Sequence, residues 1–342
     1  MTTMRDIARH AGVSVGTVSN FFNSPETVSE KTRKQVSDAI ETLDFHPHAA
    51  ARSLKSNRTR RIGIVPVISV ESNRSLHAED SAFLEFLSGI NTALAEEGFD
   101  LLLSAATSKV KETEIYQRLI GEHQVDAMIL LGMQKHDKRV KLLDSLNFPF
   151  VTFGQCGNDE KYSSVDIDGS SGIIEAMDHL VALGHQRIAF IHPPKTYSMT
   201  EQRLNGFWEA AKQHGLNPEP GYVMEGAFSI ESGQAITEKL LALPNPPTAI
   251  LTPNDISAFG ALNAIKMKKL NPGKDISVIG FDNIPSSAFW QPSLTTISQP
   301  LREIGNECGI LAVEKAKGKN NLKSIVFSTH LVIRDSTGRL DP

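Results

Sequence analysis

The 342-residue chain contains no run of about 18 apolar residues, so the sequence predicts no membrane-spanning helix. Its first ten residues are polar and charged, which argues against a secretory signal peptide and favours a cytoplasmic protein. Only two cysteines are present, Cys156 and Cys308. They fit a reduced compartment and form no metal-binding pattern, so we expect no bound metal and no cofactor.

Signatures of common nucleotide-binding and hydrolytic enzymes are also missing. No glycine-rich dinucleotide fingerprint follows Ile64, and the chain has no phosphate-binding loop, no paired His–Glu metal motif and no nucleophile elbow. His185 follows a helix-ending glycine, and His192 follows a strand before two prolines; histidines in such places usually have structural roles. The sequence therefore predicts a binding protein and not an enzyme.

The net charge of -4 is unevenly distributed along the chain. Residues 1–61 contain ten Lys and Arg against six Asp and Glu, whereas residues 62–342 contain 25 against 33. A small basic end on a larger acidic body predicts that only this end contacts phosphate. A short segment can also be basic by chance. The basic charge therefore indicates DNA binding only together with the helix pattern of the same segment.

Residues 1–46 have the pattern of a three-helix DNA-binding headpiece. Two short helices meet at Gly12, Ser14 stands at the N-cap of the second, and a third amphipathic helix begins after Ser29. Their apolar positions are spaced to form one small core, namely Ile7, Ala8, Ala11, Val13, Val18, Val36, Ala39, Ile40 and Leu43. The second helix presents small and hydrogen-bonding residues, as a recognition helix in a DNA major groove does.

Residues 47–60 are expected to form a hinge helix and a linker. Pro47 can end the third helix and start another, and the alanine-rich segment 49–55 has high helix propensity. One or two helical turns are too short to be stable alone in water, so this helix should form only when it is docked. Residues 56–61 are polar and basic.

From residue 61 onward, strand and helix patterns alternate in two successive sets. Buried strands are expected at 62–67 and 127–130 in the first set, and at 187–191 and 276–279 in the second. Repeated strand–helix units predict an α/β protein with two similarly built lobes, each with a parallel sheet covered by helices on both faces. Such folds bind ligands at the carboxyl ends of their strands, so the expected site is the cleft between the lobes.

Residues throughout the chain match one known family in order and spacing. In the headpiece and hinge they are Asp6-Ile7-Ala8, Ala11-Gly12-Val13-Ser14, Thr17-Val18-Ser19, Asn23, Val28-Ser29, Thr32-Arg33, Pro47 and Ala51-Arg52-Ser53-Leu54. In the body they are Leu183-Gly184-His185, Ile188-Ala189, Arg203, Gly206-Phe207, Asn254-Asp255, Gly280-Phe281-Asp282-Asn283, Leu294-Thr295-Thr296-Ile297 and Arg334-Asp335-Ser336-Thr337-Gly338. With this set, the chain resembles the LacI/GalR family of bacterial transcription repressors.

The resemblance implies a homodimer that binds a palindromic operator in the nucleoid of a bacterial cytoplasm. Its effector and dimerisation domain, 61–342, should resemble a periplasmic sugar-binding protein, with chain crossings near Val165, Ile297 and Ile325. Lobe one would then span about 61–165 and 298–325, and lobe two about 166–297 and 326–340. The chain ends at Pro342 without a heptad-patterned tail, which favours a dimer over a tetramer. A periplasmic binding protein would share this body, but the headpiece argues against it.

At the DNA end, family position points to Val15, Gly16 and Asn20 as specificity residues. Asn20 can bond an adenine edge and Val15 can contact a thymine methyl, whereas Gly16 departs from the hydrogen-bonding side chains common in the family. The residues placed for phosphate or backbone contacts are Thr3, Ser14, Thr17, Ser19, Asn23, Ser29 and Thr32. For Thr17 and Ser29, a helix cap or a core hydroxyl is an equally good interpretation.

In the hinge, the family positions of Ala51, Arg52 and Leu54 also imply DNA contacts. Arg52 is expected to contact a phosphate. Leu54 is expected to enter the minor groove at the operator centre, where an apolar wedge unstacks a base step and kinks the duplex. The alternative is that Leu54 packs on the effector domain.

In the effector domain, family positions place Arg203, Asn254 and Asp282 on the cleft side of the second lobe, where their donors and acceptors suit a small polyol. Four further residues are candidates. Phe228 is expected to stack on the ligand, and Gln299 to contact it from a lobe crossing. Phe83 could face the cleft or lie in the core, and Asp255 could contact the ligand or cap a helix. Asp282 could also be structural, in the turn at Gly280. The expected effector is a sugar, with a purine or a sugar phosphate as the alternative.

Overall fold

The computed structural model describes residues 2–44, 58–67, 81–157 and 161–340. The chain divides into two compact units, Met1–Thr59 and Arg60–Pro342. The first unit contains α1 (Met4–Ala11), α2 (Val15–Asn23), the short 3₁₀ helix η1 (Pro25–Thr27) and α3 (Glu30–Thr42). The expected hinge helix, with Ala51, Arg52 and Leu54, lies outside the described residues.

Local sequence signals determine where the headpiece helices begin and end. Thr3, Ser14 and Ser29 cap α1, α2 and α3, and each side chain accepts a backbone N–H of the first turn. Gly12 ends α1 with φ of 67°, a left-handed conformation that glycine adopts freely. The predicted core is confirmed, because Ile7, Ala8, Ala11, Val18, Val36 and Ala39 are buried, with Val13, Ile40 and Leu43 packed against them.

The second unit contains two six-stranded sheets with the same strand order. The first sheet runs β11 (Ser324–Phe327), β5 (Ser163–Ile167), β4 (Phe150–Phe153), β3 (Ala127–Leu130), β1 (Arg61–Ile64) and β2 (Asp100–Leu103). The second runs β12 (His330–Val332), β10 (Thr295–Ser298), β9 (Ser277–Asp282), β8 (Ala249–Leu251), β6 (Ile188–His192) and β7 (Val223–Glu225). Among the described strands, all pairs are parallel except β10 with β12. The strand order reverses between β1 and β3 and between β6 and β8, where open α/β sheets bind ligands.

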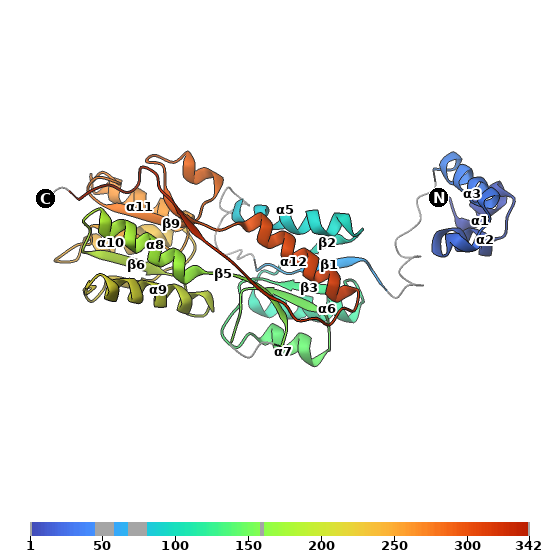
Figure 1. Cartoon of the computed structure of the whole chain (residues 1–342), viewed down its shortest axis with the longest axis horizontal. Coiled ribbons are helices and arrows are strands. Elements are labelled where there is room, and N and C mark those ends of the chain that lie inside the picture. The colour runs from blue at the N-terminus through green and yellow to red at the C-terminus, as the bar shows by residue number, and fades with distance from the viewer. Residues whose placement is uncertain (1, 45–57, 68–80, 158–160, 341–342) are drawn as a thin grey trace. The chain divides into compact units, whose positions relative to one another are not determined.

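Helices cover both faces of each sheet, which confirms the predicted α/β class (Figure 1). On the first sheet, α5 (Ser81–Glu96) and α12 (Leu301–Ala316) lie on one face, and α6 (Lys109–Gly121) and α7 (Lys138–Ser145) on the other. On the second sheet, α8 (Gly169–Ala182) and α9 (Met199–Gln213) lie opposite α10 (Ile230–Leu241) and α11 (Asp255–Met267). A short 3₁₀ helix, η3 (Pro285–Ala288), follows β9. In the part of the chain that the structure describes, no helix is long and apolar enough to cross a bilayer.

The α5–α12 pair joins two distant parts of the sequence in the first lobe (Figure 1). The helices touch through glycines, which allow the two backbones to approach closely. A Cβ atom at Gly89 would lie 1.9 Å from the carbonyl oxygen of Arg302, and one at Gly305 would lie 2.1 Å from that of Phe86. The alternating sequence pattern gives no expectation for residues 301–316, so this pairing adds to the predicted organisation of the lobe.

The chain passes between the sheets after β5, after β10 and after β11. The expected crossing points, Val165, Ile297 and Ile325, lie inside these three strands, a few residues before the chain leaves each sheet. The strands continue further because β5 and β11 remain paired as far as Ile167 and Phe327. The crossings therefore leave from the carboxyl ends of the strands, at the edge where the cleft lies.

Candidate DNA-binding and effector sites

Helix α2 presents the predicted base-contacting residues on its solvent-facing side. Val15 is 43% exposed, and Gly16 and Asn20 are also exposed. Val18, on the opposite side of the same helix, is fully buried in the headpiece core. Because burial of Val18 fixes the rotation of the helix, the side with Val15, Gly16 and Asn20 must face outward.

Some of the hydroxyl groups that the sequence assigns to phosphate contacts also form helix caps. The Ser14 hydroxyl accepts the Thr17 N–H at 3.0 Å and lies 2.9 Å from the Thr17 hydroxyl. Ser29 has the same relation to Thr32, so the capping interpretation of Ser29 describes its observed contact. Each hydroxyl pair has two protons and uses one between its members, which leaves the other to donate to a further acceptor. The remaining members of the set are the capping residue Thr3, the half-buried Ser19 and Asn23, whose side chain lies outside the description.

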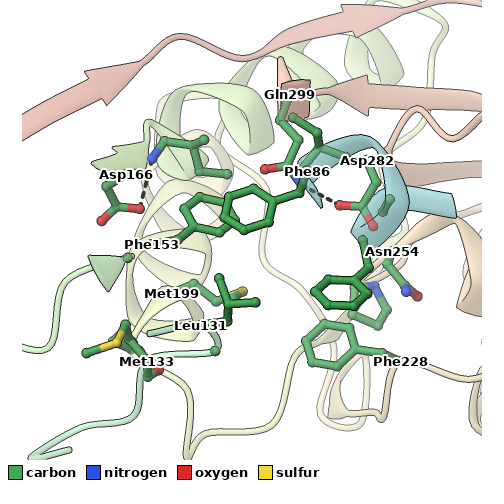
Figure 2. Close-up of a pocket in the computed structure, with 18 of the residues that line it drawn as sticks. Phe86, Leu131, Met133, Phe153, Asp166, Met199, Phe228, Asn254, Asp282 and Gln299 are labelled. Atoms are coloured by element: carbon green, nitrogen blue, oxygen red, sulfur yellow. Dashed lines mark hydrogen bonds between the residues drawn. The ribbon is translucent and has the colours of Figure 1, made fainter. Parts of the chain in front are cut away.

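A cavity of about 290 Å³ lies between the lobes at the carboxyl ends of the strands (Figure 2). Its lining contains six of the seven residues expected at the effector: Phe83, Arg203, Phe228, Asn254, Asp282 and Gln299. The lining also contains residues that sequence reasoning did not identify, among them Phe86, Leu131, Met133, Phe153, Asp166, Ser198 and Met199. Most of these follow a strand end or begin a helix, which is where parallel sheets place ligand contacts.

Aromatic rings form two walls of the cavity (Figure 2). Phe86 and Phe153, both from the first lobe, stack with their ring centroids 5.2 Å apart and their planes 18° apart. Phe228, from the second lobe, lies on another side of the cavity, and its ring meets that of Tyr197 in a T-shaped contact with the centroids 5.6 Å apart. Phe86 follows Phe83 by one turn of α5, a spacing visible in the sequence, whereas nothing local indicates that Phe153 reaches the same place.

Polar groups gather at one end of the cavity. The Gln299 side-chain nitrogen donates to the Asp282 carboxylate at 2.6 Å (Figure 2). The Asn254 side-chain oxygen caps α11 by accepting the Ser257 N–H at 2.9 Å, which leaves its amide nitrogen for a ligand. The Arg203 guanidinium is buried, donates to the Pro253 carbonyl at 2.8 Å, and its Nε has no hydrogen-bond partner among the described residues. Together these groups offer both donors and acceptors within one small volume.

Burial changes the acidity of the charged groups at this end. Burial, together with the nearby carboxylate of Asp255, raises the pKa of Asp282 to about 7, against the opposing effects of Arg203 and Gln299. Burial lowers the pKa of Arg203 to about 10, so its guanidinium stays protonated at neutral pH. Asp282 also has a φ of 112°, a left-handed conformation that is strained for a residue with a side chain. Strained and buried titratable groups of this kind cluster at functional sites.

Asp255 requires a correction, since it neither lines the cavity nor caps α11. Its side chain is fully buried and accepts the Ile284 N–H at 2.9 Å, the Ser287 hydroxyl at 2.6 Å and the Thr296 hydroxyl. The side chain occupies space left by Gly280, where a Cβ would lie 2.2 Å from an Asp255 carboxylate oxygen. Asp255 thus ties the start of α11 to the loop after β9, and the capping role belongs to Asn254.

Comparison with known proteins covers both units. Residues 3–48 match the family of bacterial regulatory proteins of the lacI type, and residues 177–337 match the periplasmic binding protein-like domain. The chain is 33% identical to the HTH-type transcriptional repressor CytR of Escherichia coli strain K12, over 99% of this chain and 97% of that protein. The chain belongs to the LacI family. It is therefore a DNA-binding transcriptional regulator with an effector-binding domain.

Solved structures of LacI-family regulators extend the comparison to the fold. The Lac repressor dimer bound to operator and the anti-inducer ONPF superposes with a TM-score of 0.85 at 28% identity, covering 98% of this chain and 99% of that one. The complex of the regulator CelR with cellobiose gives a TM-score of 0.75 at 30% identity, covering 98% and 100%. The likeness thus covers the headpiece and both lobes.

Proposed function

We propose that this LacI-family regulator is a homodimer that represses transcription from a palindromic operator and responds to a small neutral carbohydrate bound between its lobes. The observation that supports the effector class is the cavity itself, where aromatic walls accompany a cluster of hydrogen-bonding groups at one end. The apolar C–H face of a sugar packs on rings such as Phe86 and Phe228. Its hydroxyls match Arg203, Asn254 and Asp282. The solved complex of CelR with cellobiose supports the same class.

The charges that line the cavity favour a neutral effector over a sugar phosphate. Two carboxylates, Asp166 and Asp282, stand against the single guanidinium of Arg203 among the described lining residues. Asp166 is 6% exposed, so water screens its charge weakly, and it offsets the guanidinium that a phosphate would need, whereas Asp282, with its pKa raised to about 7, is charged only in part at neutral pH. The volume of about 290 Å³ lies just below the range of most ligand sites, roughly 300–1,000 Å³. Such a volume suits a compact molecule.

A nucleoside is the second candidate, and one specific observation favours it. Four phenylalanines, Phe83, Phe86, Phe153 and Phe228, line the cavity. A flat heterocycle can also stack on such rings, and the ribose would retain the hydroxyl contacts. A nucleoside has a flat heterocyclic ring and a sugar does not, so the four phenylalanines are the residues at which the two ligand classes would differ.

At the DNA end, we assign base contacts to Val15, Gly16 and Asn20 of α2. Contacts to the DNA backbone are assigned to the hydroxyl and amide residues around them, namely Thr3, Ser14, Thr17, Ser19, Asn23, Ser29 and Thr32. The exposure of the first three residues supports this assignment. Ala51, Arg52 and Leu54 complete it from the hinge, with Leu54 as the minor-groove wedge.

We also propose that the cavity binds its ligand without turnover. Ser198 is the one hydroxyl side chain among the described lining residues, and it donates to the carbonyl of Met133 at 3.2 Å instead of to a base. The assay is incubation of the full chain with p-nitrophenyl glycosides. Release of nitrophenol that disappears in Asp282→Ala would overturn this part of the proposal.

The test of the effector class is thermal stabilisation of the full chain by a panel of mono- and disaccharides, nucleosides, nucleobases and sugar phosphates. An effector at 100 times its Kd adds about 2.7 kcal/mol to the free energy of unfolding. For a domain of this size, that is a rise of roughly 5–10 °C in Tm. A neutral sugar should give the rise, and Arg203→Ala and Phe228→Ala should abolish it. Arg187→Ala is the control, because Arg187 bonds the Pro246 carbonyl on the exposed surface and lies outside the cavity lining. Stabilisation by nucleosides alone would replace the sugar assignment.

A further inference from the structure

A second connection joins the lobes beside the cavity, apart from the three chain crossings. Residues 133–135, which follow β3, pair with residues 196–198, which follow β6, through an antiparallel bridge between Gln134 and Tyr197. We call these two segments the cross-lobe strap. Within the strap, the Ser198 N–H donates to the Met133 carbonyl at 3.0 Å and the Lys135 N–H to the Thr196 carbonyl at 3.2 Å. None of the strands β5, β10 and β11, which lead into the crossings, neighbours β3 or β6.

A surface ion pair reinforces the strap across the same gap. The ammonium of Lys135, in lobe one, lies 2.7 Å from the carboxylate of Glu201, in lobe two. This contact lowers the pKa of Glu201, so the pair stays ionised at neutral pH. Both side chains are at least half exposed, and exposed pairs are weak. The ion pair therefore adds to the two backbone hydrogen bonds without replacing them.

The lobe-one half of the strap rests on a buried charge cluster. The Arg139 guanidinium contacts Glu112 at 2.9 Å and Asp137 at 2.6 Å, with all three side chains at most 8% exposed. Arg139 also donates to the Gly132 carbonyl at 3.3 Å, and Asp137 accepts the Gln134 N–H at 3.1 Å. These bonds hold residues 132–134 in one conformation. Desolvating three charges is expensive and contributes little stability of its own, so a conformational role accounts for the cluster better.

The lobe-two half of the strap contacts the aromatic wall of the cavity. The rings of Tyr197 and Phe228 form a T-shaped contact, and Ser198 and Met199 line the cavity directly. On the other side, Gly132 and Met133 also belong to the lining. The strap is thus continuous with the effector site in both lobes, and a ligand that moves Phe228 must displace or tighten Tyr197.

From these contacts we propose that the cross-lobe strap is a latch that holds the two lobes together beside the cavity, and that Arg139 and its carboxylates are positioning residues that preset its lobe-one half. The latch does not depend on the chemical class of the effector. The effector would then act on this latch, by stabilising or releasing it through Phe228 and Tyr197. A ligand can shift this equilibrium only by its different affinities for the latched and open states.

Amide hydrogen exchange of the full chain, without added ligand, tests the latch. The reporter is the Ser198 N–H, because its acceptor lies in the other lobe. We expect this amide to be protected, and we expect Lys135→Ala to speed its exchange about two- to fivefold, in proportion to the loss of an exposed ion pair. Lys111→Ala, which removes an exposed ion pair within α6, is the matched control and should leave the Ser198 amide unchanged. Exchange of the wild-type Ser198 amide at an unprotected rate would overturn the proposal.

Glu112→Gln tests the positioning role, since it removes one buried charge but keeps the side-chain shape, so it is milder than removing Arg139. If the cluster presets the strap, exchange at Ser198 accelerates, although Glu112 and Ser198 lie in different lobes. An unchanged Ser198 amide in a folded Glu112→Gln protein would refute the positioning role.

A cysteine pair provides an independent measurement of closure. Gln134 and Tyr197 form a non-hydrogen-bonded antiparallel pair, whose Cα separation of about 4.5 Å suits a disulfide. In a Cys156→Ser background, Gln134→Cys with Tyr197→Cys should oxidise rapidly without ligand. Gln155→Cys with Asn205→Cys, two positions that face one hollow without a mutual bond, serves as the comparison and should oxidise slowly. Equal rates for the two pairs would mean that random lobe motion, and not a latch, brings the segments together.

Discussion

Replacing Asp255 by alanine should destabilise the effector domain without removing an effector contact. The substitution leaves three buried donors, from Ile284, Ser287 and Thr296, without their acceptor. Each unsatisfied buried group costs about 1–3 kcal/mol, and the two hydroxyls can partly turn toward other acceptors. We therefore expect a loss of about 3–5 kcal/mol in the free energy of unfolding. For a domain of this size, that is a decrease of roughly 6–20 °C in Tm.

The neighbouring Asn254→Ala substitution should have the opposite effect, with little loss of stability and complete loss of the effector response. Loss of the α11 cap costs about 1 kcal/mol, but loss of the side-chain amide from the cavity should abolish stabilisation by the effector. Unfolding can be followed by Trp290 fluorescence, because its ring stacks on Phe259 of α11 at 4.1 Å. An Asp255→Ala protein with wild-type Tm and no effector response would refute the structural role assigned to this carboxylate.

Three further outcomes follow from the same contacts. Asn20→Ala should weaken operator binding by about 1–3 kcal/mol with unchanged Tm, since the side chain is exposed; equal loss on random DNA, measured by fluorescence anisotropy, would contradict base recognition. Leu54→Ala should reduce specific binding far more than nonspecific binding, and equal losses would argue against the wedge. Because burial raises the pKa of Asp282 to about 7, the folded state binds its proton more tightly than the unfolded chain, so stability should fall as pH rises from about 4 to 7. Asp282→Asn should flatten that slope in urea titrations; an unaltered slope would mean that Asp255, whose pKa burial raises to about 6, accounts for it instead.

The headpiece could be predicted almost completely because its signals are local. Caps at Ser14 and Ser29, the turn at Gly12 and one apolar stripe define three helices within 40 or so residues. In the effector domain, the alternating pattern predicted the class, but α12 was missed even though its buried positions Ile304 and Cys308 have helical spacing. Its role emerges only in the pairing with α5, a contact that no local pattern encodes.

The effector cavity shows the same limit more sharply. Family position identified Arg203 and Asn254, whereas Phe153 and Asp166 reach the cavity only because β4 and β5 end beside it. Asp255 is adjacent in sequence to the cavity residue Asn254, and this adjacency wrongly suggested that Asp255 also contacts the effector. Successive residues at a helix start point in different directions, and here one side chain faces the cavity while the next is enclosed beneath the loop after β9.

The close contact of α5 with α12 also constrains how the protein is made. The headpiece is continuous in sequence and has all its core residues once the ribosome has synthesised α3. The first lobe, in contrast, lacks one of its covering helices until α12 emerges, and its sixth strand, β11, follows later still. During translation, α5 and the sheet beneath it must wait with an uncovered apolar face while the entire second lobe is synthesised. A message cut short before residue 301 would therefore yield a competent headpiece attached to an effector domain that cannot close its own core.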